Sequence, residues 1–274
     1  MIPPPIFETV AVQPVAPWIG GKRFLSRRVI ERLAAIPHRT YAEPFVGMGG
    51  VFLRRPERAH AEVINDANRE VATLFRVLQR HYVAFLDMVR FQLTSRAEFE
   101  RLARSDPATL TDMERAARFL YLQRTAFGGK VRGQNFGVSA GLPGRFDITK
   151  LGPMLEALHE RLAGVVIECL GWPAFIARYD RAGTLFYLDP PYWGSEDDYG
   201  RDVFPRADFA RLAETLRALK GRFVLSINDT PETRALFEGF AIEAVEVTHT
   251  IVGGLHGAKP KARELLITRL PETG

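Results

Sequence analysis

Short apolar runs alternate with amphipathic stretches along most of the chain, and this alternation predicts strands and helices in turn. Apolar runs bounded by glycine or polar residues predict buried strands at 61–66, 165–170, 184–188 and 223–227. Apolar residues spaced three and four apart predict helices over 23–35, 68–89, 172–179, 207–220 and 230–237. The last two strands, expected over 241–252 and 264–270, form a closing pair. The pattern predicts an α/β fold built on a largely parallel sheet.

Residues 91–160 break this alternation. Helical patterns over 95–104 and 112–123 are followed by a glycine-punctuated stretch, 127–137, that interleaves basic, amide and aromatic residues. Such a mixture suits a surface that reads DNA bases and phosphates, and a solvated hairpin is the alternative. We therefore predict an inserted helical and hairpin subdomain. The expected division is 1–90 for the first part of the main domain, 91–160 for the insert and 161–274 for the second part.

Composition sets the class of protein but not its function. With 274 residues, 46% of them hydrophobic and 25% charged, the chain is expected to form one large domain or one domain with an insert. No apolar run approaches the roughly 20 residues of a membrane span, and the first residues lack the features of a signal peptide. The single cysteine, Cys169, has apolar neighbours that suggest a buried thiol. We expect a cytoplasmic protein without a bound metal, since the six histidines are scattered.

The charge is mildly basic, at +5 with a pI of about 9.5. Lysine occurs at only 6 positions, so 31 of the 37 basic residues are arginine. Arginine makes bidentate contacts to phosphate and to guanine. The excess permits a nucleic-acid partner without requiring one.

The most informative stretch is Asp189-Pro190-Pro191-Tyr192, directly after the predicted strand at 184–188. Open α/β sheets bind ligands at the carboxyl ends of their strands. The prolines fix the backbone, so the Asp189 carboxylate and the neighbouring carbonyls form a rigid row of acceptors beside the Tyr192 ring. This arrangement suits a planar group with an amino donor, such as a nucleobase. A strand that simply ends in a proline turn is the alternative.

Two glycine-bearing turns precede this motif. Residues 17–22 present Trp18 and Lys22 on either side of Gly20 and Gly21. Residues 41–50 lead from a short strand through Gly47 and Gly49 into a helix, a geometry that can cradle a cofactor. Asp66 follows Gly47 by 19 residues, near the spacing at which an acid reaches ribose hydroxyls. An ordinary strand–helix turn remains the alternative.

Together these stretches resemble the DNA adenine methyltransferase (Dam-like) family over roughly residues 16–270. The matching motifs occur in the family's order and are Trp18 to Lys22, Glu43-Pro44-Phe45-Val46-Gly47-Met48-Gly49, Ile64-Asn65-Asp66, Asp189-Pro190-Pro191-Tyr192 and Glu264-Leu265-Leu266-Ile267. Residues 119–129 also resemble the family's insert.

The resemblance implies a Rossmann-like sheet that binds S-adenosylmethionine, with an inserted target-recognition subdomain. It implies cofactor contacts from Trp18, Gly20, Gly21, Lys22, Pro44, Phe45, Gly47, Gly49, Asp66 and Asp189. Catalysis falls to Asp189, Pro190 and Tyr192. The expected partner is double-stranded DNA, with a monomer favoured and a prokaryotic or phage source expected.

We expect DNA contacts from Arg124, Phe127, Lys130, Arg132, Asn135, Lys259 and Lys261. Phe127 stands where the family carries an aromatic that enters the base stack, and Arg132 where it carries a guanine-reading arginine. The chain departs from the family where Gly128 replaces the usual asparagine and Gly133 an aromatic. A GATC target therefore does not follow from the resemblance. Ala174 stands where the family often has an acid, which leaves the contact to the cofactor adenine open.

The implied reaction is direct, in-line methyl transfer to the amino group of an adenine flipped out of the duplex. Four alternatives stay open at this point: methylation of the cytosine amino group, an RNA substrate, a nicotinamide-dependent oxidoreductase and a non-catalytic DNA-binding protein. The sequence does not give the recognition site or tell whether a restriction partner exists.

Overall fold

The protein is described here from a computed structural model that covers residues 7–22, 24–137, 141–196, 204–248 and 261–270. Its centre is a seven-stranded sheet with the order β5-β4-β2-β6-β7-β9-β8. The strands are β2 (Thr40–Glu43), β4 (Ala61–Asn65), β5 (Val166–Glu168), β6 (Thr184–Leu188), β7 (Arg222–Asn228), β8 (Ala241–Thr248) and β9 (Lys261–Thr268). The first five strands in this order are parallel, whereas β9 runs antiparallel to both of its neighbours. The predicted α/β fold and the closing strand pair are confirmed.

Eight α-helices lie within the described ranges. They are α1 (Ser26–Ala34), α2 (Arg69–Val89), α3 (Arg96–Arg104), α4 (Asp112–Thr125), α5 (Ile148–Leu162), α6 (Trp172–Tyr179), α7 (Ala207–Ala218) and α8 (Pro231–Leu236). Polar side chains fix several starts: Asn68, Ser95 and Asp147 each accept a backbone N–H at the first turn of α2, α3 and α5. None of these helices is long and apolar enough to cross a membrane.

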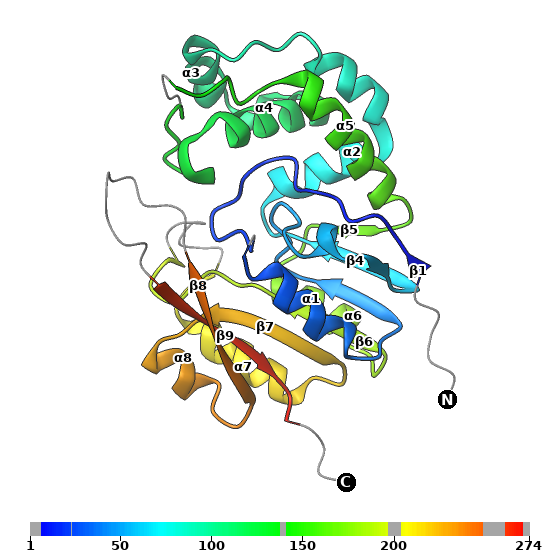
Figure 1. Ribbon diagram of the computed structural model, residues 1–274, viewed down its shortest axis with the longest axis vertical. Coiled ribbons are helices and arrows are strands. Elements are labelled where there is room, and N and C mark those ends of the chain that lie inside the picture. Colours follow the sequence, from blue (N-terminus) through cyan, green and yellow to red (C-terminus); the bar gives the residue numbers. More distant parts are fainter. Residues whose placement is uncertain (1–6, 23, 138–140, 197–203, 249–260, 271–274) are drawn as a thin grey trace.

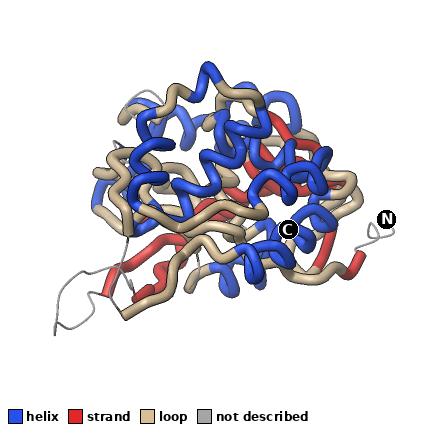
Figure 2. The backbone as a smooth tube through the Cα atoms, turned by 90° about the horizontal axis from the view of Figure 1, so that it is seen from above, coloured by secondary structure: helices blue, strands red, loops and turns tan. Residues whose placement is uncertain are grey.

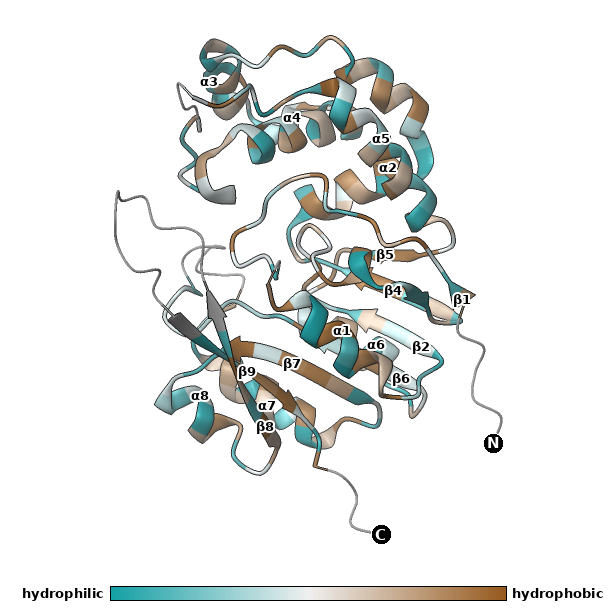
Figure 3. Ribbon diagram, in the orientation of Figure 1, coloured by the Kyte–Doolittle hydropathy of each residue, from teal (hydrophilic) through white to brown (hydrophobic). Residues whose placement is uncertain are grey.

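The central strands of the sheet are buried on both faces. Along β6, Leu185 and Tyr187 face the core that includes α1, α2, α4 and α5, whereas Phe186 and Leu188 face the core under α6 and α7. Strands buried on both sides read as continuous apolar runs, and β7 is coloured as hydrophobic over most of its length (Figure 3).

A helical layer, α2 to α5, stands over one end of the sheet (Figure 1). Seen from above, helices cover much of the molecule, with strands visible between them (Figure 2). The N-terminal segment, starting with β1 (Phe7–Glu8), which pairs with β3 (Glu57–Arg58), runs between this layer and the sheet. Helix α2, from the predicted first part of the main domain, packs on α4 and α5 of the predicted insert, so these contacts do not separate the two parts. The boundaries at residues 90 and 160 therefore remain a prediction.

A buried ion cluster joins the sheet to the helical layer. Glu62 of β4 accepts hydrogen bonds from Arg55 at 2.9 Å and from Arg161 of α5 at 2.6 Å, and Arg58 lies 3.4 Å from it. Arg55, Glu62 and Arg161 are all at most 4% exposed. Since a charge is costly to bury alone, each member of the cluster depends on the others.

Three sequence expectations were wrong or incomplete. Cys169 is exposed rather than buried, because it follows the three-residue edge strand β5, where even Val166 is 47% exposed. The helix α5 lies in the part of the insert for which no helix was predicted. The 127–137 stretch is a loop, with a short 3-10 helix at Phe127–Gly129 and one bridge between Ala126 and Phe136.

Candidate active site

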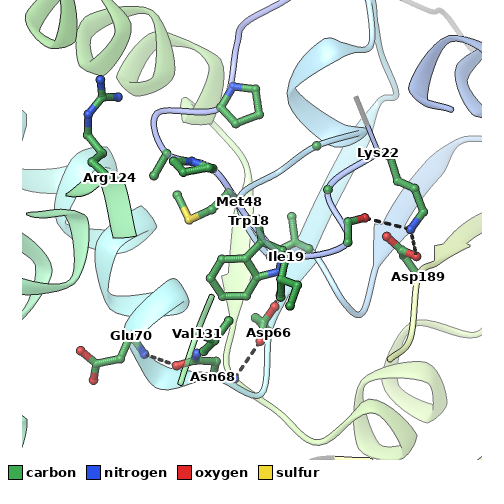
Figure 4. A pocket seen from close by; sticks show the side chains of 18 of the residues that line it. Trp18, Ile19, Lys22, Met48, Asp66, Asn68, Glu70, Arg124, Val131 and Asp189 are labelled. Carbon is green, nitrogen blue, oxygen red and sulfur yellow. Dashed lines mark hydrogen bonds and ion pairs between the residues drawn. The ribbon is translucent and has the colours of Figure 1, made fainter. Parts of the chain in front are cut away.

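One large cleft opens where β2, β4 and β6 end. Because these neighbouring strands are parallel, the residues that follow them meet at one edge of the sheet. The cleft has a volume of about 1410 Å³ and reaches from this edge to the helical layer. Figure 4 shows Lys22 beside Asp189 on one side of the cleft, Arg124 on the other, and Trp18 between them near Asp66.

Asp66 closes the turn after β2. Its Oδ2 accepts a hydrogen bond from the backbone N–H of Gly47 at 2.9 Å, and its Oδ1 accepts one from that of Asn68 at 2.8 Å. Burial raises the pKa of Asp66 to about 6, although both backbone bonds oppose the shift. Each carboxylate oxygen can accept more than one bond, so Asp66 can still receive hydroxyl groups from a ligand.

Trp18 lies directly against this turn. A Cβ atom at Gly47, whose φ is +49°, would come within 2.6 Å of Trp18 Nε1. The position therefore requires glycine for both its conformation and its space. Trp18 also packs edge-on against Phe119 of α4, with ring centroids 6.2 Å apart. The indole thus forms a wall shared by the glycine turn and the helical layer.

Asp189 lies at the opposite side of the cleft floor, at the end of β6. Its Oδ1 is 2.6 Å from the ammonium of the buried Lys22 and accepts a hydrogen bond from Ser226 at 3.0 Å. Burial raises the pKa of Asp189, and the Lys22 ammonium opposes that shift. Ser226 is in turn 2.9 Å from the hydroxyl of Tyr187. The side chains of two strands therefore fix the position of this carboxylate.

Tyr192 is held beside Asp189 from two directions. Its hydroxyl donates a hydrogen bond to Oε2 of Glu264, and the Lys22 ammonium lies 4.6 Å from its ring centroid. Desolvation raises the pKa of Tyr192 well above its ordinary value, so the phenol stays protonated at neutral pH. The ring is therefore fixed in orientation.

The backbone that follows Tyr192 is also fixed. Asn228, at the end of β7, accepts a hydrogen bond from the backbone N–H of Trp193 and donates one to its carbonyl, each at 2.9 Å. Asn65, at the end of β4, fixes the backbone on the other side of the cleft in the same way. It donates to the carbonyls of Pro44 and Leu170 and accepts from the backbone N–H of Leu170.

Glu43 is a further buried acid in the cleft. Its Oε2 accepts a hydrogen bond from Tyr41 at 2.5 Å, and burial raises its pKa to about 8. At neutral pH Glu43 is therefore largely protonated, which limits the negative charge around Asp189.

Most of the predicted cofactor and catalytic residues do meet in this cleft. Those that line it are Trp18, Gly20, Gly21, Lys22, Pro44, Phe45, Gly47, Asp66, Asp189 and Tyr192. Gly49 and Pro190 lie outside the lining. Gly49 has a φ of +75°, and a Cβ there would come within 2.7 Å of Leu53 Cγ, so its part is structural.

The residues predicted to contact DNA are more dispersed. Arg124 and Arg132 line the cleft, and Phe127, Lys130, Arg132 and Asn135 are exposed on the 127–137 loop. The Arg124 guanidinium donates to the carbonyls of Val15 and Arg145. Lys261 lies at the start of β9, and Lys259 lies outside the described residues. All of these DNA contacts stay predictions.

Several site residues were missed by the sequence reasoning. Glu264 was noted as the start of a strand that matches a family motif but not as a site residue, and Ser226 only as part of an apolar run. The one available signal was a polar residue within each buried strand, which by itself does not reveal the partner. Gln123, which is completely buried near the end of α4, was included only as part of the stretch that resembles the family's insert, with no role assigned.

The fold and this cleft together define a class: an α/β protein whose cleft has a glycine turn and the buried Asp66 at one side and the Asp189 carboxylate and Tyr192 ring at the other. Residues 18–251 match the family described as D12 class N6 adenine-specific DNA methyltransferase. The chain belongs to that family. It is an adenine-specific DNA methyltransferase, as the family resemblance of the sequence predicted.

Individual relatives agree with this assignment. The chain is 28% identical to the type II methyltransferase M1.LlaDCHI of Lactococcus lactis subsp. cremoris, with 94% of this chain and 96% of the relative covered. It is 27% identical to a DNA adenine methylase of Salmonella typhi, covering 93% and 94%. The type II methyltransferase M.CviBI of a Chlorella virus is 24% identical, covering 84% and 88%.

The family uses S-adenosylmethionine, and the cleft residues fit this group. A ribose suits the Asp66 carboxylate, and the close approach of Trp18 to Gly47 gives a flat apolar wall. The volume exceeds the roughly 300–1,000 Å³ of a single small-ligand pocket, which leaves room for a base. Among the described residues, no group of three or more histidine, cysteine, aspartate or glutamate side chains is arranged to hold a metal ion.

Proposed function

We propose that the Trp18–Asp66 side of the cleft binds S-adenosylmethionine and that the Asp189–Tyr192 side receives an adenine from double-stranded DNA. The observation that carries this proposal is that Asp66 and Asp189 line one continuous cleft. A bound cosubstrate and a flipped base can therefore lie within reach of each other. Such proximity supplies a large part of the rate of a transfer reaction.

The residues around Asp189 prepare the amino group. Lys22 and Ser226 both contact Oδ1, so we assign Oδ2 to accept one amino hydrogen of adenine. The family motif assigns the second hydrogen to the carbonyl of Pro190, which lies outside the cleft lining. These bonds draw the nitrogen lone pair out of conjugation with the ring. When bound, the cosubstrate supplies an electrophilic methyl group. One amino proton must then leave, and Asp189, whose pKa is raised by burial, accepts it.

The DNA side of the proposal rests on the exposed loop at 127–137. Phe127 is 51% exposed, so its ring can enter the space that a flipped base vacates. Extruding the base costs a few kcal/mol, and stacking on Tyr192, worth about 1–3 kcal/mol, offsets part of it. Arg132 and Lys130 are exposed and basic, as contacts to a base edge or a phosphate require.

Two variants test the two sides separately. Asp66→Ala removes the acceptor of the Gly47 and Asn68 N–H groups, so we expect a loss of S-adenosylmethionine affinity of tenfold or more by calorimetry. Asp189→Ala should abolish transfer while leaving DNA affinity within about threefold of wild type. Unchanged turnover in Asp189→Ala would refute the assignment of the catalytic carboxylate.

A further inference from the structure

Gln123 joins the predicted cofactor segment to the predicted DNA-reading loop. Its side-chain amide donates hydrogen bonds to the carbonyl of Pro17 at 2.8 Å and to that of Gly129 at 2.7 Å. Its Oε1 accepts a hydrogen bond from Gln134 at 3.2 Å. Gln123 is completely buried. Both donors and the acceptor of one side chain are therefore used to connect two segments far apart in the sequence.

The two segments also touch each other directly. The backbone N–H of Ile19 donates to the carbonyl of Gly129 at 3.0 Å. A Cβ atom at Gly129, whose φ is +68°, would lie 3.0 Å from the backbone nitrogen of Trp18. Trp18 in turn lies against Gly47, which is bonded to Asp66. A continuous set of contacts thus leads from Asp66 through Trp18 to the loop.

Further hydrogen bonds hold the part of the loop that comes after Gly129. Gln134 donates to the carbonyl of Lys130 at 2.8 Å as well as to Gln123, so it closes the segment that presents Arg132. The backbone N–H of Phe127 donates to the carbonyl of Asn135 at 2.9 Å. The segment that carries Arg132 is therefore tied to Gln123 at Gly129 and at Gln134, and Phe127 is tied to the end of the same segment.

A second residue of α4 holds the same junction. Arg124, next to Gln123, donates to the carbonyls of Val15 and Arg145, and Arg145 donates to the carbonyl of Ala126 at 2.9 Å. Burial lowers the pKa of Arg124, because desolvation disfavours the charged form of the guanidinium. The end of α4 is thus hydrogen-bonded to the N-terminal segment on one side and to the loop on the other.

We propose that Gln123 is a positioning residue that couples occupancy of the cofactor side of the cleft to the conformation of the 127–137 loop. This inference rests on the proposed function. A ligand that orders Trp18 orders Pro17 and Ile19, and through Gln123 and Gly129 it orders the loop that meets DNA. Cofactor and DNA then bind more tightly together than separately, and the coupling is reciprocal.

The test compares Gln123→Met with a matched control, Gln79→Met. Gln79 has the same kind of contacts, because its amide donates to the carbonyls of Leu162 at 2.7 Å and Val165 at 2.8 Å, away from the cleft. The DNA affinity of each protein is measured with and without sinefungin, a cofactor analogue that cannot donate a methyl group. The duplex carries the sequence that the wild type methylates, and the salt concentration is held constant.

We expect sinefungin to tighten DNA binding by wild type and Gln79→Met by the same factor, in the range of about 5–150 typical of coupled sites. In Gln123→Met the factor should fall to within about twofold of unity, with sinefungin affinity in the absence of DNA changed by less than threefold. The reciprocal experiment, sinefungin affinity with and without DNA, must give the same factor for each protein.

If Gln123→Met fails to fold, Gln134→Ala replaces it, since it removes only the outer bonds to Gln123 and Lys130. It should lose a smaller part of the coupling. The inference would be overturned if Gln123→Met, or Gln134→Ala used in its place, showed the same coupling factor as Gln79→Met. A wild type that methylates DNA but shows no coupling would also overturn it. A wild type that methylates no DNA would instead refute the proposed function.

Discussion

The ammonium of Lys22 lies 2.6 Å from Oδ1 of Asp189 and 3.9 Å from Oε2 of Glu264. Lys22 is only 4% exposed, and its ammonium also donates a hydrogen bond to the carbonyl of Gly20, 3.1 Å away. A residue from the N-terminal turn therefore opposes the rise that burial causes in the pKa of the carboxylate in the catalytic motif.

Lys22→Met should move the acid limb of the pH–rate profile to higher pH. Burial already raises the pKa of Asp189 and Lys22 opposes that rise, so removing the ammonium raises the pKa further. The ionised carboxylate then forms only at higher pH, which kcat/KM measured from pH 5 to 9 would reveal. Lys220→Met, a substitution of an exposed lysine, is the control. An acid limb at the wild-type position in Lys22→Met would show that Lys22 does not set this ionisation.

Arg132→Ala should relax base preference at one position of the target. A bidentate contact from arginine to guanine is worth about 1–3 kcal/mol of discrimination. Lys130→Ala, on the same exposed loop, should weaken binding to all sequences about equally and lower its salt dependence. Competition binding over a set of duplexes with single substitutions distinguishes the two results. A uniform loss in Arg132→Ala would make it a phosphate contact.

Glu43→Gln should make stability less dependent on pH. The pKa of Glu43 rises from 4.5 to about 8 on folding, so the folded state binds the extra proton between these values. Stability therefore falls as pH rises through this window, by at most about 1.4 kcal/mol per pH unit. A neutral glutamine can still accept the Tyr41 hydrogen bond and removes this slope. The free energy of unfolding of both proteins is measured in urea at pH 5, 6.5 and 8. The same pH dependence in the variant and the wild type would contradict this account.

Glu62→Ala should destabilise the protein by about 3–5 kcal/mol, because Arg55 and Arg161 would be left buried without their anion. Glu31→Ala is the matched control, since Glu31 pairs with Arg27 on an exposed helix face and such pairs contribute little. Urea unfolding of both variants gives the comparison. Equal, small losses would show that the buried cluster is not important for stability.

Most of the main-domain fold could be predicted from the sequence. The α6 and β6 bounds agree with the predicted ranges, because a proline at the helix start and a fully apolar strand bounded by polar residues are local signals. The edge position of β5 could not be predicted, since it depends on strand order. Cys169 was therefore assigned to the interior on the basis of its apolar neighbours, two of which, Val166 and Ile167, are themselves at least partly exposed.

The candidate site was predictable as motifs but not as contacts. Trp18, Asp66 and Asp189 were named from their local patterns; parallel strand ends bring Asp66 and Asp189 to one cleft, and the N-terminal segment brings Trp18 there. The partners Glu264 and Ser226 come from strands far along the chain, where only the sheet order makes them neighbours of Asp189. Arg124 reads as a free basic side chain in the sequence, whereas the fold uses it to hold two carbonyls.

The most direct test of the central claim is nucleoside mass spectrometry of unmethylated plasmid DNA incubated with S-adenosylmethionine and either the wild-type protein or Asp189→Ala. The account predicts N6-methyladenine with the wild type, confined to one sequence context, and none with Asp189→Ala. Methylcytosine in place of methyladenine, or equal methylation by both proteins, would contradict it.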